Sequence, residues 1–297
     1  ETATSLNNLA VLYEKMGNYT RAEPLYKRSL KIKEKALGPD HPTTATSLNN
    51  LAVLYSNMGD YARAEPLQRR ALTVYVKSLG PGHSYTAIAL SRLAQLYVIM
   101  GNYTRAEPLY KRSLKIFEKV LGPEHPNTAI LIETLAGLYS NIGDYALAEP
   151  LYQRSLKILE KSLGPDHPYT STLLSNMAGL YSNIGDYAHA EPMYKRALKI
   201  KEKTLGPDHP TTAIQIFNLA EMEGSQKNFD KAFSYFKTGL NKQDSHISNV
   251  FSIATEQQKL KFINSINYYY YETLSLIRQH FKLDQDAVSY ALDLVLR

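Results

Sequence analysis

The sequence predicts an all-α fold, a solenoid of helix-turn-helix repeats with a C-terminal helical extension. Three observations support this prediction. The string Leu-Gly-Pro recurs at a constant step of 42 residues, a single glycine midway through each interval keeps the same step, and apolar residues within each interval follow helical spacing. Self-similarity at a fixed period of 20–50 residues is typical of repeat architectures. The string begins at Leu37, Leu79, Leu121, Leu163 and Leu205, and the glycines are Gly17, Gly59, Gly101, Gly143 and Gly185.

Each repeat is expected to hold two antiparallel helices. In the second copy, Ala45, Leu48 and Leu51 start an apolar pattern with steps of three and four residues. Gly59-Asp60 should end this helix and cap the next, which we expect over about 61–79 before Gly80-Pro81 stops it. A proline at position 66 and at each equivalent position predicts either a late helix start or a bend.

The chain is expected to contain three segments, divided where the 42-residue period stops. Five repeats and a degenerate sixth predict an array over 1–240, a polar linker is expected at 241–254, and a helical extension at 255–297. In the extension, Thr255-x-x-Gln258 is a capping box before a long helix over about 256–281, and a second helix is expected over about 284–296. The long helix carries an apolar stripe that should cover the exposed end of the last repeat. The stripe comprises Leu260, Ile263, Ile266, Tyr270, Leu274 and Ile277.

The repeated residues resemble the tetratricopeptide repeat. The resemblance rests on Asn8-Leu9-Ala10-x-x-Tyr13, Gly17-x-Tyr19, Ala22 and Tyr26, and it implies a right-handed superhelix with the first helices on the concave side. The 42-residue unit with its Leu-Gly-Pro-Asp-His-Pro connector is similar to the repeats of kinesin light chain. The sixth copy departs from the pattern, with Lys227 in place of the glycine and Phe229 in place of the tyrosine.

The C-terminal segment resembles the helical linker of bacterial TPR–CHAT proteins, in which a caspase- or separase-like protease domain follows the repeats. The matching stretches are 254–260 and 287–297. The resemblance implies a downstream protease domain as a partner, but its catalytic histidine and cysteine have no counterpart within these residues. Because Thr2-Ala3-Thr4-Ser5 is equivalent to Thr44-Ala45-Thr46-Ser47, we expect the sequence to be a fragment of a longer protein.

Composition excludes several classes of site. The absence of cysteine excludes disulfides, cysteine-ligated metals and cysteine nucleophiles within these residues. Five of the eight histidines are distributed one per repeat, which separates them too far to share a metal ion. No Gly-x-Ser-x-Gly turn or glycine-rich phosphate loop occurs, and no apolar run approaches the ~20 residues that cross a bilayer. We therefore expect a cytoplasmic protein that is not an enzyme, has no cofactor or metal, and does not enter a membrane.

Basic residues concentrate on the second helix of each repeat. The net charge is only +6, and glutamates precede many of the basic residues by four positions, as in Glu23–Lys27 and Glu65–Arg69. This pattern favours a solvated outer surface on the convex side. Weak nucleic-acid binding through that surface is the alternative interpretation. We do not expect nucleic acid to be the main partner of this chain.

The concave side is the predicted binding site. Asparagine offers both a donor and an acceptor, so a row of asparagines can bind the backbone of an extended peptide whatever its sequence. The resemblance to kinesin light chain implies that role at the asparagines, although they could instead bridge adjacent repeats. Arg92 and Glu133 interrupt the row of asparagines. They could pair with each other across adjacent repeats or bind a charged side chain of a ligand. The predicted peptide-binding groove comprises Asn7, Asn8, Asn49, Asn50, Ser91, Arg92, Glu133, Thr134, Ser175, Asn176 and Asn218.

The sequence therefore predicts a non-catalytic scaffold that binds a protein or an extended peptide, as the recognition or regulatory arm of a larger TPR–CHAT protein. The alternatives are a weak nucleic-acid-binding module and a purely structural spacer.

Overall fold

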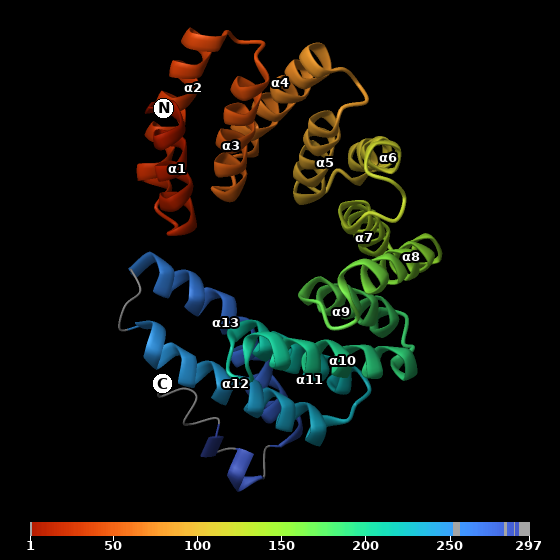
Figure 1. Cartoon of the computed structure of the whole chain (residues 1–297). Helices are drawn as coiled ribbons and strands as arrows, with labels where there is room; N and C mark the ends of the chain where they lie inside the picture. The colour runs from red at the N-terminus through yellow and green to blue at the C-terminus, as the bar shows by residue number, and fades with distance from the viewer. Residues whose placement is uncertain (1, 252–255, 282–283, 288, 291–297) are drawn as a thin grey trace. The chain divides into compact units, whose positions relative to one another are not determined.

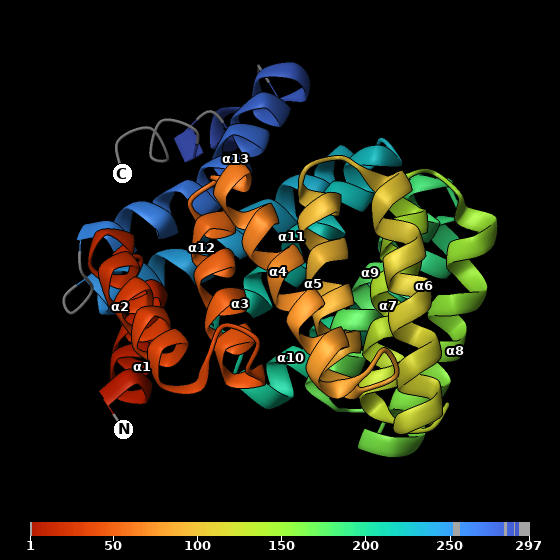
Figure 2. The same ribbon diagram turned by 90° about the horizontal axis from the view of Figure 1, so that it is seen from above.

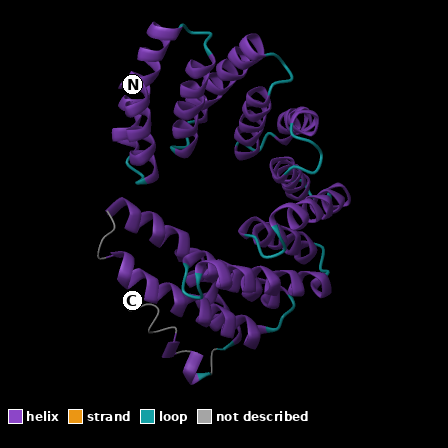
Figure 3. Ribbon diagram, viewed as in Figure 1, coloured by secondary structure: helices purple, strands orange, loops and turns teal. Residues whose placement is uncertain are grey.

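The computed structural model describes residues 2–251, 256–281, 284–287 and 289–290, with side chains described except at 244–251 and 256–266. Within these residues the chain is helical with short connections and has no strand (Figure 3). It divides into two compact units, Glu1–Ile158 and Leu159–Arg297. The helices are α1 Thr2–Lys15, α2 Tyr19–Leu37, α3 Pro42–Asn57, α4 Tyr61–Leu79, α5 Ser84–Ile99, α6 Tyr103–Val120, α7 Pro126–Asn141, α8 Tyr145–Leu163, α9 Pro168–Asn183, α10 Tyr187–Leu205, α11 Pro210–Ser225, α12 Phe229–Phe251 and α13 Glu256–His280.

Consecutive helices form hairpins, one per repeat. Figures 1 and 2 show α1 beside α2, α3 beside α4 and α5 beside α6 in the first unit, and α9 beside α10 and α11 beside α12 in the second. The all-α array of helix-turn-helix repeats is thus confirmed. In the second repeat α4 has the predicted bounds, Tyr61–Leu79. Because Pro66 is the sixth residue of α4, a late helix start is excluded.

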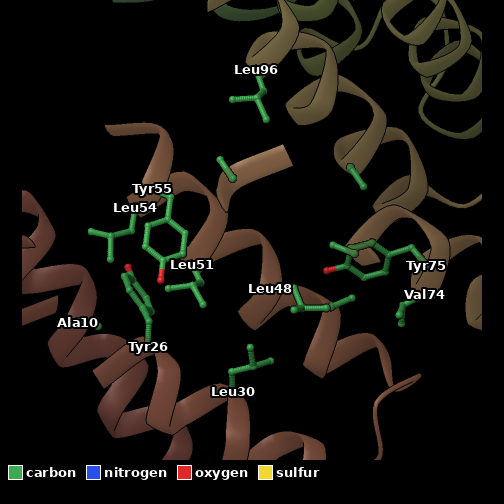
Figure 4. Packing of buried hydrophobic residues seen from close by; sticks show 14 of the residues in the cluster. Ala10, Tyr26, Leu30, Leu48, Leu51, Leu54, Tyr55, Val74, Tyr75 and Leu96 are labelled. Atoms are coloured by element: carbon green, nitrogen blue, oxygen red, sulfur yellow. The ribbon is translucent and has the colours of Figure 1, made fainter. Parts of the chain in front are cut away.

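Small and aromatic residues together fill the space between helices. Ala10 and Ala22 are completely buried, which lets the backbones of α1 and α2 approach closely. Tyr26 is 1% exposed and donates its hydroxyl hydrogen to Glu14 Oε2 at 2.6 Å. Figure 4 shows Tyr26 and Tyr55 close together, within the buried cluster formed by the first two repeats and α5 of the third. Each repeat therefore buries its apolar surface against its neighbours, as expected of a solenoid.

The connector histidines cap the first helices. His41 Nδ1 accepts a hydrogen bond from the backbone N–H of Thr43 at 3.1 Å, and His125 does the same for Asn127 at 3.1 Å. His83, His167 and His209 make the equivalent bonds. Each bond satisfies one of the N–H groups that a helix N-terminus leaves without an intrahelical partner. These histidines therefore organise the N-terminal ends of the first helices.

The helix-ending glycines adopt a left-handed backbone conformation. Gly59 has φ 77° and Gly185 has φ 80°, a region that residues with a Cβ rarely occupy. In the sixth repeat Lys227 takes this conformation with φ 65°. Replacing the glycine by Lys227 therefore preserves the turn of the other repeats, at the cost of backbone strain at Lys227.

The polar stretch that begins at residue 241, predicted as a linker, is helical as far as Phe251. α12 continues through it to Phe251, because nothing in the sequence Asn241–Asn249 breaks a helix: it contains neither proline nor glycine. α13 begins at Glu256 as expected and ends at His280, one residue before the predicted end. Most of the second predicted helix, over 284–296, lies outside the described residues, as do the side chains of Leu260, Ile263 and Ile266.

The C-terminal helix packs on the last repeat. Tyr270, Leu274 and Ile277 of the predicted stripe belong to the cluster that contains Phe217 of α11 and Phe236 of α12. Tyr269 stacks on Phe217 with their ring centroids 3.9 Å apart. Tyr268 and Tyr271, which flank Tyr269 and Tyr270 in the run Tyr268-Tyr269-Tyr270-Tyr271, are 54% and 71% exposed and face solvent. α13 therefore covers the apolar surface of the sixth repeat.

Candidate peptide-binding surface

The predicted site residues lie on the first helices of the repeats, and we call them the first-helix row. In the first unit they lie on α1, α3, α5 and α7, and in the second unit on α9 and α11. Their exposure differs. Exposed side chains are Asn8, Arg92 and Asn176; half-buried ones are Asn7, Asn50, Ser91, Glu133, Thr134, Ser175 and Asn218; Asn49 is buried.

Some members of the row connect adjacent repeats. Asn50 Nδ2 donates to Asn7 Oδ1 at 3.0 Å, which ties α3 to α1. Ser175 Oγ hydrogen-bonds Gln215 Oε1, which ties α9 to α11. The bridging role, which is the alternative to peptide binding, therefore applies to Asn7, Asn50 and Ser175.

Other members turn toward their own helix or into the core. Thr134 Oγ1 donates to the carbonyl oxygen of Ile130 at 2.8 Å. Asn49 is only 5% exposed, and its Oδ1 has no hydrogen-bond partner. In the sixth repeat the position equivalent to Asn49 is Phe217, which is completely buried beneath Tyr269. The row therefore contains exposed, half-buried and buried side chains. At the C-terminal end of the row, α13 covers Phe217, which is next to Asn218 in the sequence.

A pocket lies on the row in the second and third repeats. It is lined by Val53 and Ser56 of α3, Gln68 of α4, and Arg92 and Gln95 of α5, and its volume is about 160 Å³. Of these residues the sequence prediction included Arg92 alone. A signal for Gln68 was present, since the equivalent position is aromatic in every other repeat: Tyr26, Tyr110, Tyr152, Tyr194 and Phe236.

A second recurring arrangement joins the repeats on the side of the second helices. Tyr55, Tyr97 and Tyr139 each donate a hydroxyl hydrogen to a glutamate of the preceding repeat at 2.8 Å. A basic residue four positions later pairs with the same carboxylate. The three sets are Glu23 with Lys27, Glu65 with Arg69, and Glu107 with Lys111.

These contacts make the glutamates better acids. The hydrogen bond from Arg69 is the largest influence that holds the pKa of Glu65 below its usual value of 4.5, and the bond from Tyr97 acts in the same direction. Burial opposes both effects more weakly. The ionised carboxylate is thus the form that the folded repeat stabilises.

We expect acid to weaken this contact between repeats. Because the pKa of Glu65 is lowered in the folded state, its stabilising contribution is present above about pH 4.5 and is lost as the pH falls through the lower folded-state pKa. Glu65→Gln should lower the free energy of unfolding by about 0.2–1 kcal/mol at pH 7. It should also reduce the loss of stability between pH 5 and pH 3, measured by urea denaturation.

Glu202→Gln is the matched control, because Glu202 is an exposed glutamate on α10. It should change neither the stability at neutral pH nor its acid dependence. If Glu65→Gln followed the same pH profile as the unmodified protein, the ionised pair would contribute nothing to the contact between repeats.

Several basic residues of the second helices pair with acidic residues. Besides the sets above, Arg70 pairs with Glu34, Arg154 with Glu118, and Arg196 with Glu160, at 2.7–2.8 Å. These are bridges between successive second helices, with the arginine side chains about 40% exposed. Their positive charge is largely balanced locally, as predicted for a solvated surface.

Among the described residues, no group of three or more His, Asp or Glu side chains is placed to hold a metal ion. The same part of the chain contains no helix long and apolar enough to cross a membrane.

Solved structures share this architecture. A Podosopora anserina protein described as a kinesin light chain with nearly identical TPR-like repeats is 26% identical, with a TM-score of 0.59 over 68% of this chain and 95% of that chain. BtubC (BKLC) from P. vanneervenii, at 22% identity and a TM-score of 0.62, covers 79% of this chain and 92% of its own. The apo form of RapI, at 15% identity and a TM-score of 0.65, matches 98% of this chain and 97% of its own. The last two show similarity of fold alone.

Among curated protein sequences, none matches this chain. The profile of the tetratricopeptide repeat, in contrast, matches residues 1–77, 43–119, 85–161, 131–203 and 190–244. These overlapping matches extend over the whole repeat array. The similarity to kinesin light chain repeats that the connector indicated is confirmed in the solved structures. The chain belongs to the tetratricopeptide repeat family.

Proposed function

We propose that this chain is a non-catalytic scaffold that binds an extended peptide segment of a partner protein along the first-helix row. Tetratricopeptide scaffolds generally mediate protein–protein interaction, and repeat arrays offer extended surfaces for it. The observation that carries the proposal is the exposure of Asn8 and Arg92 at equivalent positions of two repeats of the first unit; in the second unit Asn176 is exposed at the same repeat position. Their amide and guanidinium groups can hydrogen-bond the backbone or side chains of a peptide without burying a large apolar area.

We further propose that the chain serves as the recognition arm of a larger cytoplasmic TPR–CHAT protein. The support is the sequence resemblance at 254–260 and 287–297, most of which lies outside the described residues. Sequencing the complete reading frame tests this directly. A downstream domain with paired catalytic histidine and cysteine is the expected result, and its absence would refute the assignment.

We do not extend the proposal to nucleic acid. Several basic side chains of the second helices pair with glutamates of their own or neighbouring repeats, as in Arg70–Glu34 and Arg196–Glu160. Binding a phosphate backbone would require breaking these pairs in exchange for new ones.

Mutation of the row tests peptide binding. Peptides are first selected against the chain from a random library displayed on phage, and their affinities are measured by fluorescence anisotropy. Asn50→Ala together with Asn176→Ala should weaken binding about ten-fold or more, since each lost hydrogen bond costs about 0.5–1.5 kcal/mol and 1.4 kcal/mol is ten-fold. The matched control replaces Asn141 and Asn183, exposed asparagines at the ends of α7 and α9, and should leave affinity unchanged.

Asn8→Ala separates binding from structure, because Asn50 also bonds Asn7 whereas Asn8 is exposed. Loss of affinity in Asn8→Ala with an unchanged melting temperature supports peptide binding. A double mutant that binds normally would contradict the proposal. A double mutant that unfolds, with Asn8→Ala binding normally, would favour a structural role for the asparagines. A library that yields no binder would favour a structural spacer.

A further inference from the structure

Gln68 is the exception among six equivalent positions. The other five hold aromatic side chains, and all are at least nine-tenths buried: Tyr26 at 1% exposed, Tyr110 at 2%, Tyr152 at 4%, Tyr194 at 7% and Phe236 at 4%. Gln68 is equally buried, at 3% exposed, but its side chain is shorter and lacks a ring. The second repeat thus lacks the group that fills this space elsewhere.

The neighbouring repeats indicate where that missing group would lie. Tyr152 Oη is 3.6 Å from the position that a Cβ at Gly137 would occupy, and Tyr194 Oη is 3.5 Å from the corresponding position at Gly179. Residues equivalent to Gly137 are Val53 and Gln95, which both line the pocket of about 160 Å³. The pocket therefore lies close to the place that the tyrosine hydroxyl reaches in an ordinary repeat, and it opens on the first-helix row.

The pocket holds an unsatisfied acceptor. Gln68 Oε1 is buried and has no hydrogen-bond partner. A buried polar atom without a partner is unfavourable, so a bound group that donates a hydrogen bond to it would be stabilised there. Ser56, Gln95 and Arg92 supply further polar groups, and Val53 and Ile99 supply apolar wall.

We propose that this pocket is a subsite for a carboxamide side chain, asparagine or glutamine, of the bound peptide. A carboxamide is complementary to Gln68 whichever way the Gln68 amide is turned, because each group carries both a donor and an acceptor. Its NH₂ group donates to Gln68 Oε1, and its carbonyl oxygen can accept from Arg92 at the rim. A carboxylate would suit Arg92 but has no hydrogen to give Gln68 Oε1, and an aliphatic side chain would leave both groups unpaired.

This inference deepens the proposed peptide-binding function and rests on it, but the pocket can be tested without a peptide. The probe is propionamide, titrated into ¹⁵N-labelled protein, with propionate as the matched carboxylate. Propionamide should shift the side-chain NH₂ resonances of Gln68 in a saturable way, and propionate should not. Exposed Gln153 on α8 is the internal control and should shift with neither probe.

Gln68→Tyr restores the residue type of the other repeats. It should fill the pocket, raise the melting temperature by removing the unpaired acceptor, and abolish the response to propionamide. That response is followed in the variant through the backbone amide resonances of Val53 and Gln95. A saturable response of equal size in Gln68→Tyr would overturn the proposal. So would an unmodified protein in which Gln68 does not respond or responds more strongly to propionate.

Binding of substituted peptides tests the subsite separately from the proposed scaffold function. In a selected peptide, the residue nearest Arg92 is located by a spin label and replaced in turn by Gln, Asn, Glu, Leu and Ala. Binding should be at least ten-fold tighter for Gln or Asn than for Leu or Glu, and Gln68→Tyr should remove the preference. Peptides that bind without this preference would overturn the subsite and leave the scaffold function standing. If no peptide binds while propionamide does, the scaffold function fails and the pocket stands.

Discussion

Gly239→Ala should destabilise the sixth repeat by about 1–3 kcal/mol, the range for overpacking a filled core. A Cβ at Gly239 would come within 2.8 Å of Cδ1 and Cζ of Phe217, which is completely buried and held between Phe236 and Tyr269. Helix propensity alone gives the opposite sign, since alanine stabilises a helix interior by about 1 kcal/mol relative to glycine. We expect the clash to decide the outcome, because the ring is completely buried and any shift disturbs its stacking on Tyr269. Urea denaturation followed by circular dichroism measures the effect.

A double-mutant cycle identifies the clash as the cause. In the fifth repeat the equivalent pair is Ser175 and Ala197, so Phe217→Ser with Gly239→Ala recreates a pair that this chain already tolerates. In the Phe217→Ser background, Gly239→Ala should be neutral or stabilising. If it destabilised both backgrounds equally, the explanation by contact with Phe217 would be wrong.

Deleting residues 252–297 should lower the melting temperature by at least roughly 5 °C and promote aggregation. The deletion leaves α12 complete but removes Tyr269, Tyr270, Leu274 and Ile277 from the cluster around Phe217. Exposing a buried aromatic or leucine-sized side chain costs about 1.5–3 kcal/mol, and 1 kcal/mol corresponds to about 2–4 °C in a protein of this size. Differential scanning calorimetry and light scattering at several protein concentrations provide the measurement.

Replacing Tyr268 and Tyr271 by serine is the control for the deletion. Both side chains are more than half exposed, so this variant should melt within about 2 °C of the unmodified protein, as surface substitutions usually do. An unchanged melt in the deletion variant would mean that α13 is a tether and does not cover the last repeat.

The covering of Phe217 also bears on the proposed function. Its equivalents in the first two repeats are the polar Asn7 and Asn49, whereas in the sixth repeat the position is aromatic and stacked under Tyr269. Under the proposed function, a peptide bound along the second unit would meet α13 at this point of the row. The aromatic residue at this position packs against the chain's own C-terminal helix instead of facing solvent.

The repeat, its two helices and most of their ends could be predicted from sequence. Helix ends depend on local chemistry: Asp60 accepts from the N–H of Arg63, Gly80 adopts φ 94°, and Pro42 occupies the first turn of α3. The same signals recur every 42 residues, so a helix end that one copy indicates only weakly is also indicated by the other copies. The secondary structure of the stretch predicted as a linker did not follow from its polarity, because low hydrophobicity alone does not stop a helix and α12 continues through Phe251.

The chemistry of the row could not be predicted in the same way. Asn8 and Asn50 occupy equivalent positions, yet Asn8 is exposed while Asn50 is half-buried and donates to Asn7 of the preceding repeat. Likewise, Gln68 could be seen as an exception in the sequence, but only the packing of α3, α4 and α5 around it shows an acceptor buried without a partner. Periodicity specifies which face of a helix points inward, because that depends on neighbours three and four residues away. Whether a polar atom on that face is paired depends on side chains some 40 residues distant, and those contacts exist only once adjacent repeats have packed.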